Sequence, residues 1–289
     1  MRGTSRGLLV VVGLVVACGP PSRNSPDGGG SHGSGGDAND NSSGCSDAAK
    51  AVYVIDQLSN HLSRFDPATK TFADLGQLHC ATAFGAQPFS MGVDRTATAW
   101  VLYDSGELFQ VDIASLACTK TSWTTQQGLK VFGMGFSTDT PGGTTDSLFV
   151  GGGMTREQSP VTVARLDTQT MTAMPIGSAA QVPEMTGTGN AQLWGFMAEP
   201  TTSHVIEIDK TNGSILQSFP EPTLAGTDAG YAFAFWGGDF WVFFIHSGDA
   251  ESKVYQVDGH TGAIKGTTSS MGRTIVGAGV STCAPVVIQ

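Results

Sequence analysis

The sequence lacks every short motif that would name a reaction. It contains no His-Glu-x-x-His, Cys-x-x-Cys, Gly-x-Ser-x-Gly, phosphate-binding loop or dinucleotide fingerprint. The glycine run at 151–153 lies between two expected strands and opens no helix, so it does not predict a phosphate site. The six histidines are scattered without the spacing of a metal site. We therefore expect no metal and no cofactor.

Basic residues are also scarce. The chain has 15 Lys and Arg against 25 Asp and Glu, which gives a formal net charge of −10. Two of the arginines, Arg2 and Arg6, lie in the first 17 residues, and their removal would leave the rest still more acidic. This balance argues against nucleic acid and anionic lipid head groups as partners.

No apolar run is long enough to span a bilayer, which takes roughly 20 residues. The longest, Leu8 to Ala17, follows Arg2 and Arg6, and this order is typical of an export signal over residues 1–17. It ends in Leu14-Val15-Val16-Ala17-Cys18, which resembles the lipobox of bacterial lipoproteins. The resemblance implies that Cys18 is diacylated, becomes the new N-terminus and anchors the protein to a membrane. The alternative is an ordinary signal peptide with an incidental cysteine.

Residues 18–45 are almost entirely Gly, Ser, Pro, Asp and Asn, and they include no aromatic residue. Such a composition cannot bury apolar surface, so we expect a disordered tether before the folded domain. Gly19 follows Cys18, where an Asp would retain a lipoprotein at the inner membrane under the enteric sorting rule. We expect a location in the cell envelope, at the outer membrane rather than the inner one.

One sequence pattern, which we call the blade pattern, recurs five times after the tether. It consists of an aromatic residue within an apolar run, a variable loop, and a polar-apolar-Asp ending. The endings are Arg64-Phe65-Asp66, Gln110-Val111-Asp112, Arg165-Leu166-Asp167, Glu207-Ile208-Asp209 and Gln256-Val257-Asp258. Successive aspartates lie between 42 and 55 residues apart. A repeat of this length made of short strands predicts an all-β fold, a five-bladed β-propeller over residues 46–289.

Two further positions repeat with the aspartates. One strand of each blade carries one aromatic residue, which we expect between blades: Tyr53, Trp100, Phe149, Trp194 and Trp241. An innermost strand has Gly or Ala at its fourth position: 89–93, 132–136, 184–188, 231–235 and 276–280. Each repeated Asp precedes a polar turn, so it is expected to bind turn amides rather than to contribute to a metal site.

The first blade has no inner strand before it, whereas a spare one lies at 276–280. We therefore expect the C-terminal strand to close the ring. A short apolar segment, Val286-Val287-Ile288, keeps a six-bladed alternative open. Cys45, Cys80, Cys118 and Cys283 allow three disulfide pairings in an exported chain. Ring closure favours Cys45–Cys283, which leaves Cys80–Cys118.

The first copy of the blade pattern resembles repeats of bacterial surface and periplasmic propellers. It reads Tyr53-Val54-Ile55-Asp56, followed by Leu62-Ser63-Arg64-Phe65-Asp66-Pro67. These propellers include the YVTN and virginiamycin-lyase-like groups, and the whole chain resembles uncharacterised bacterial lipoproteins with a tether and a propeller. The resemblance implies a fold for residues 46–289 and transfers no active site. The lyase-like groups use a catalytic histidine within the propeller, and no histidine of this chain lies on an expected inner strand.

The loops that enter the inner strands share one face with those between the second and third strands, and variable loops on a rigid scaffold are where binding sites form. That face should receive His79, Trp123, Asp228 and Arg273. Glu184 is the one charged residue at the first position of an inner strand. It is either an axial carboxylate, able to bind a cation or act as a general base, or an exposed side chain at a frayed strand start after Pro183.

We expect a monomeric binding or scaffolding module that uses its variable loops to hold a protein or glycan ligand. The alternative is a metal-dependent lactonase- or lyase-like propeller with Glu184 near the axis.

Overall fold

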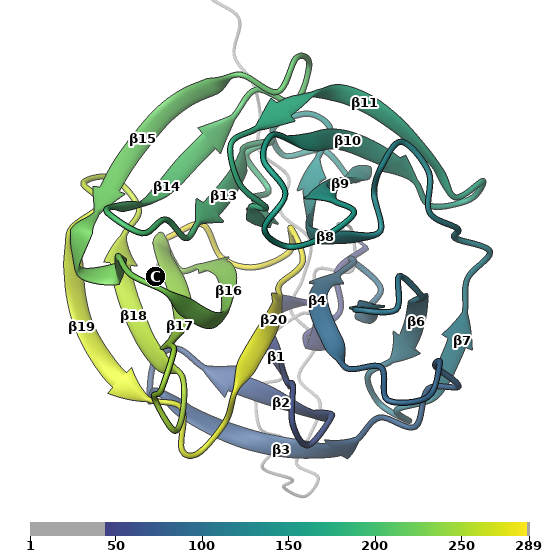
Figure 1. Cartoon of the computed structure of the whole chain (residues 1–289), viewed down its shortest axis with the longest axis horizontal. Coiled ribbons are helices and arrows are strands. Elements are labelled where there is room, and N and C mark those ends of the chain that lie inside the picture. Colours follow the sequence, from purple (N-terminus) through teal and green to yellow (C-terminus); the bar gives the residue numbers. More distant parts are fainter. Residues whose placement is uncertain (1–43, 288–289) are drawn as a thin grey trace, which may run out of the picture. The chain divides into compact units, whose positions relative to one another are not determined.

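The computed structural model describes residues 44–287, which form a ring of five antiparallel blades around one axis (Figure 1). The expected five-bladed β-propeller is thereby confirmed. The described residues include two short 3-10 helices, Ala48–Lys50 (η2) and Pro222–Leu224 (η3). No helix within this part of the chain is long and apolar enough to cross a membrane. The export signal, Cys18, residues 18–43 of the tether, and Ile288 lie outside the described residues.

Each blade has four strands, which follow one another from the axis outward. Blade 1 consists of β20 (Ile275–Gly279), β1 (Val52–Asp56), β2 (His61–Asp66) and β3 (Thr71–Gln77). Blade 2 consists of β4 (Pro88–Val93), β5 (Thr98–Tyr103), β6 (Leu108–Asp112) and β7 (Cys118–Lys120). Blade 3 consists of β8 (Val131–Thr138), β9 (Asp146–Gly153), β10 (Val161–Asp167) and β11 (Thr172–Ala179). Blade 4 consists of β12 (Glu184–Gly187), β13 (Leu193–Met197), β14 (Ser203–Ile208) and β15 (Ile215–Glu221). Blade 5 consists of β16 (Asp228–Trp236), β17 (Asp239–His246), β18 (Lys253–Asp258) and β19 (Ile264–Ser269).

The C-terminal strand closes the ring, as expected. β20 pairs antiparallel with β1, with Tyr53 opposite Gly279 and Val54 opposite Ala278. Val286 and Val287 do not form a strand, so the six-bladed alternative is wrong. The chain is instead held there by the Gly237 N–H, which donates to the Pro285 carbonyl at 2.7 Å.

Two disulfides tie the ring. Cys45 is bonded to Cys283 with their Cα atoms 5.8 Å apart, which joins the entry to blade 1 with the residues after the closing strand. Cys80 is bonded to Cys118 with their Cα atoms 5.2 Å apart, which joins the segment after β3 to the outer strand of blade 2. This is the pairing that ring closure favours.

The apolar core consists of five clusters, one between each pair of neighbouring blades. Each of the five repeated aromatics is buried in one of these clusters: Tyr53, Trp100, Phe149, Trp194 and Trp241. Packing between neighbouring blades therefore stabilises the ring, and large aromatic side chains take part in it.

The five repeated aspartates hold hairpin turns, as expected. In each turn one carboxylate oxygen accepts backbone N–H groups; Asp258 accepts those of His260 at 3.0 Å and Thr261 at 2.9 Å. The other four are Asp66, Asp112, Asp167 and Asp209. These hydrogen bonds favour the charged form and lower the pKa of every one of the five, to about 2 for Asp258.

The antiparallel order gives the propeller two faces. We call the loop face the one formed by connections that enter the inner strands and by those between second and third strands, such as 57–60 and 154–160. The hairpin face is the opposite one, with the turns of the repeated aspartates. Both the start of the described chain, at Gly44, and its end, after β20, lie on the hairpin face.

Candidate functional site

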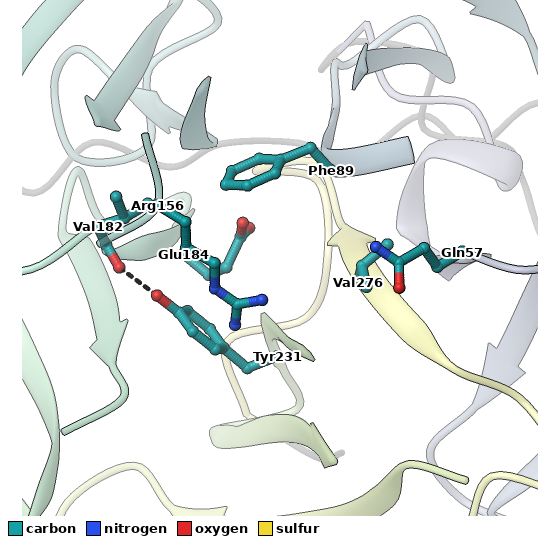
Figure 2. A pocket seen from close by; sticks show the side chains of 7 residues that line it. All are labelled: Gln57, Phe89, Arg156, Val182, Glu184, Tyr231 and Val276. Atoms are coloured by element: carbon teal, nitrogen blue, oxygen red, sulfur yellow. Dashed lines mark hydrogen bonds between the residues drawn. The ribbon is translucent and has the colours of Figure 1, made fainter. Parts of the chain in front are cut away.

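The axis ends at the loop face in a small cavity of about 20 Å³ (Figure 2). Four of its lining residues lie at or near the starts of inner strands: Phe89, Glu184, Tyr231 and Val276. Gln57, Arg156 and Val182 complete the lining. A volume of this size holds about one water molecule.

Glu184 is the first residue of β12, and its side chain is buried against blade 2. The residue is 2% exposed, and its Oε2 accepts a hydrogen bond from the Ser90 hydroxyl at 2.9 Å. Burial raises the pKa of Glu184 well above its ordinary value, although the Ser90 hydrogen bond and the charge of Arg156 oppose the rise. The structure therefore favours the neutral carboxylic acid, and the expectation of an exposed side chain at a frayed strand start is wrong.

Arg156 reaches this site from the connection between β9 and β10. Its guanidinium forms an ion pair with Asp228, and one of its nitrogens donates to the Ala229 carbonyl at 3.2 Å. The guanidinium carbon lies 4.7 Å from the centroid of the Tyr231 ring. Figure 2 shows the side chain passing Glu184 and ending beside this ring. Arg156 is thus held by a carboxylate, a carbonyl and an aromatic face at once.

Tyr231 is itself fixed by its hydroxyl. This group donates to the Val182 carbonyl at 2.6 Å, as the dashed line in Figure 2 shows. Burial raises the pKa of the phenol, so the hydroxyl keeps its proton and the ring keeps its position.

A larger pocket of about 390 Å³, open to solvent, is also lined by Arg156. It is lined by Arg156, Glu157, Gln181, Ala198, Pro200, Gly226, Thr227, Asp228 and Tyr231. Arg156 and Tyr231 line both this outer pocket and the axial cavity. The Arg156 side chain therefore borders both a solvent-open hollow and the axial cavity that the buried Glu184 carboxyl lines.

The site does not suit a metal ion. Within residues 44–287 no three His, Cys, Asp or Glu side chains gather as a metal would require. In addition, the guanidinium of Arg156 already lies beside the Asp228 carboxylate, and a second cation there would be repelled. Glu184, the axial acid that a metal-dependent mechanism would need, is favoured in its neutral form.

The other loop-face residues singled out from the sequence do not meet at this site. His79 is exposed, whereas Trp123 is buried against Phe132 with ring centroids 5.4 Å apart, so Trp123 is not available to a ligand. Arg273 lies over the Phe72 ring at 4.9 Å and lines a separate hollow of about 250 Å³ together with His61 and Asp74. Of these residues only Asp228 joins the surroundings of Glu184.

Sequence reasoning missed Arg156. The signal for it is the length of its loop: the spacing from Phe149 to Asp167 is the longest among the five blades. That spacing shows that the β9–β10 connection is extended, but not that one of its side chains turns inward to the axis.

No family model matches the sequence, and no curated protein matches it. Solved structures of β-propeller proteins do match. One is a protein of unknown function from Bacteroides caccae, with 15% identity and a TM-score of 0.40 over 76% of this chain and 73% of that chain. Another is the calcium-binding protein regucalcin from Agrobacterium tumefaciens, with 12% identity and a TM-score of 0.47 over 81% of this chain and 76% of that chain.

Proposed function

We propose that this chain is an exported binding protein, anchored through Cys18, which captures a polypeptide ligand with its loop face. One observation carries the proposal. Four large apolar side chains stand exposed on four separate connections of this face: Leu58, Phe84, Met154 and Met271. Apolar side chains exposed on loops of a rigid scaffold are available to a partner, and methionines adapt to varied partners.

The positions of the two ends of the described chain also support the loop face as the binding surface. Gly44 and the Cys45–Cys283 disulfide lie on the hairpin face, so the described chain enters the propeller on the face opposite the loop face. The two disulfides are also typical of an oxidising compartment, which supports export.

Charge narrows the choice of partner. The loop face carries several acidic side chains besides Asp228: Asp104, Glu107, Glu157, Glu199, Asp249 and Glu251. An acidic surface with apolar projections suits a peptide with basic and apolar side chains better than a nucleic acid or an anionic glycan. A metal-dependent lactonase or lyase is not favoured, because Arg156 takes the place beside Asp228 and Tyr231 where a cation would bind.

The repeated blade pattern also supports a proposal about the family to which the propeller belongs. We place the chain with bacterial propeller lipoproteins that carry YVTN or virginiamycin-lyase-like repeats, on the strength of the segment from Tyr53 to Pro67. This proposal concerns the scaffold and assigns no lyase activity.

A displayed library of random twelve-residue peptides, selected on the full chain in mild detergent, tests the binding function. We expect enriched peptides that bind wild type and lose binding to a variant with serine at Leu58, Phe84, Met154 and Met271. A matched variant replaces three apolar residues exposed on outer strands, Met174, Ile215 and Leu216, by serine and should bind as wild type does. No enrichment, or equal loss in both variants, would overturn the proposal.

The anchor has its own test. In a Gram-negative host, wild type should take up labelled palmitate and sediment with the outer membrane, whereas Cys18→Ser should do neither. Release of wild type into the periplasm as an unlabelled protein would show that the N-terminal segment is an ordinary signal peptide.

A further inference from the structure

Arg156 is held by groups that are complementary to a guanidinium in charge, hydrogen bonding and shape. The Asp228 carboxylate and the Ala229 carbonyl accept its hydrogen bonds, while the Tyr231 ring covers one face of the planar cation. Proteins bind the arginine side chains of their ligands with this combination of carboxylate, carbonyl and aromatic face.

Among residues 44–287, Arg156 is also the only cation at this place. Apart from it, the axial cavity and the outer pocket are lined by the carboxyl groups of Glu157 and Asp228, by the buried Glu184, whose neutral form is favoured, and by residues without charge. Arg156 and Tyr231 border both hollows, while the buried Glu184 carboxyl lines the axial cavity and the Asp228 carboxylate lines the outer pocket. Removal of the Arg156 side chain would free the space beside these groups that its guanidinium now fills.

The contact that holds Arg156 is one that can be exchanged. Its side chain keeps 27% of its accessible surface and that of Asp228 keeps 20%, so water reaches the ion pair. The residues on either side of it, Thr155 and Glu157, are exposed in a connection whose internal hydrogen bonds run chiefly through Gln158. Because water reaches both side chains, a guanidinium from a ligand could enter as Arg156 leaves and form the same contacts with Asp228, Ala229 and Tyr231.

We propose that the pocket formed by Asp228, Tyr231 and Glu184 is a binding site for the guanidinium of a ligand's arginine side chain, and that Arg156 occupies it as a built-in competitor. This inference deepens the proposed function and rests on it for the nature of the ligand, a polypeptide. When an arginine of the ligand enters, Arg156 swings out with its loop into solvent. Met154, exposed on the same loop, is then carried along with Arg156.

The test compares two short peptides, acetyl-Gly-Arg-Gly-amide and the same peptide with citrulline, which has the shape of arginine without its charge. Dissociation constants are measured by calorimetry on the full chain. Arg156→Ala should bind the arginine peptide at least tenfold more tightly than wild type and should gain nothing toward the citrulline peptide. Adding Asp228→Asn to Arg156→Ala should abolish the gain.

Arg165→Ala is the matched control, because Arg165 is exposed on β10 of the same blade and lies outside the pocket. It should leave the dissociation constant as in wild type. If Arg156→Ala folds poorly, as judged by near-ultraviolet circular dichroism, Arg156→Gln keeps the stem of the side chain and should show a smaller gain in the same direction. Equal affinity of wild type and both Arg156 variants, or equal gains for the two peptides, would overturn the inference.

The two proposals can fail separately. Selected peptides that bind the loop face but lack arginine, with affinity unaffected by Asp228→Asn, would leave the binding function intact and refute the guanidinium site. Tight binding of the arginine peptide to Arg156→Ala, without any peptide enriched from the library, would support the site and refute the wider role of the apolar loops.

Discussion

Glu221 differs from the other carboxylates of the loop face in having no partner for one buried oxygen. The residue closes β15 at 3% exposure, and its Oε1 has no hydrogen-bond partner among the described residues. Burial raises its pKa to about 7. Burial thus raises the pKa of two carboxyl groups of the loop face, Glu184 and Glu221, but Glu184 has Ser90 as a hydrogen-bond partner.

The raised pKa of Glu221 makes a prediction about stability. Between about pH 4.5 and 7 the folded state holds a proton that the unfolded state has lost, so the free energy of unfolding falls as the pH rises through this range. The full loss is at most about 3.5 kcal/mol, at about 1.4 kcal/mol per pKa unit over a shift of about 2.5 units. Glu221→Gln should remove this part of the pH dependence and be more stable than wild type at pH 8, measured by urea unfolding.

Glu157→Gln serves as the comparison, because Glu157 is exposed on the loop face. It should leave the dependence of stability on pH as in wild type. If Glu221→Gln keeps the wild-type profile between pH 5 and 8, the Glu221 carboxylate has a partner that water or a loop rearrangement supplies.

At the scale of single residues, the sequence predicted the roles of those residues that recur in every blade. The five aspartates and five strand aromatics recur with the blade, and their roles follow from local turns and from alternation along a strand. Arg156 and the burial of Glu184 could not be found in this way. Asp228 lies 72 residues from Arg156, and Ser90 lies 94 residues from Glu184, so both contacts exist only once the ring has closed.

At the scale of elements, glycine is required where inner strands approach one another. A Cβ atom on Gly187 of β12 would lie 2.2 Å from the Phe136 carbonyl oxygen and 2.5 Å from the Ser137 Cα atom on β8. A Cβ on Gly135 would meet the Met185 backbone at 2.7 Å. The recurrent glycine at the fourth position was therefore a sound sequence signal for the inner strands, and its cause is backbone contact between blades.

Gly187→Ala should be destabilised by about 2 kcal/mol or more, because backbone atoms of a neighbouring blade must move to admit the methyl group. Gly266→Ala is the matched variant on an outer strand, β19. Its Cβ would meet only the flexible end of Lys70 at 3.3 Å, and the substitution should change stability by less than about 1 kcal/mol in either direction. The free energy of unfolding of both variants is measured in urea. Similar losses of this free energy in the two variants would mean that the blades can separate freely at the axis.

At the scale of the molecule, the ring is closed on the hairpin face by more than the pairing of β20 with β1. Arg95 of blade 2 forms an ion pair with Asp146 of blade 3 at 3.0 Å, and the other oxygen of Asp146 accepts a hydrogen bond from Thr282 at 2.7 Å. The Ser281 hydroxyl donates to the Ala49 carbonyl at 2.6 Å. These contacts join Thr282 to blade 3 and Ser281 to the segment before blade 1, close to the Cys45–Cys283 disulfide.

The two disulfides should differ in how much they contribute to the free energy of unfolding. Cys45 and Cys283 are separated by 238 residues, and Cys80 and Cys118 by 38. Because the entropy that a cross-link removes from the unfolded chain grows with the length of the closed loop, the first should stabilise the protein by about 5 kcal/mol and the second by about 4 kcal/mol. We expect Cys45→Ser/Cys283→Ser to lose more free energy of unfolding in urea than Cys80→Ser/Cys118→Ser. The opposite order would mean that the length of the closed loop does not set the relative contributions of the two disulfides to the free energy of unfolding.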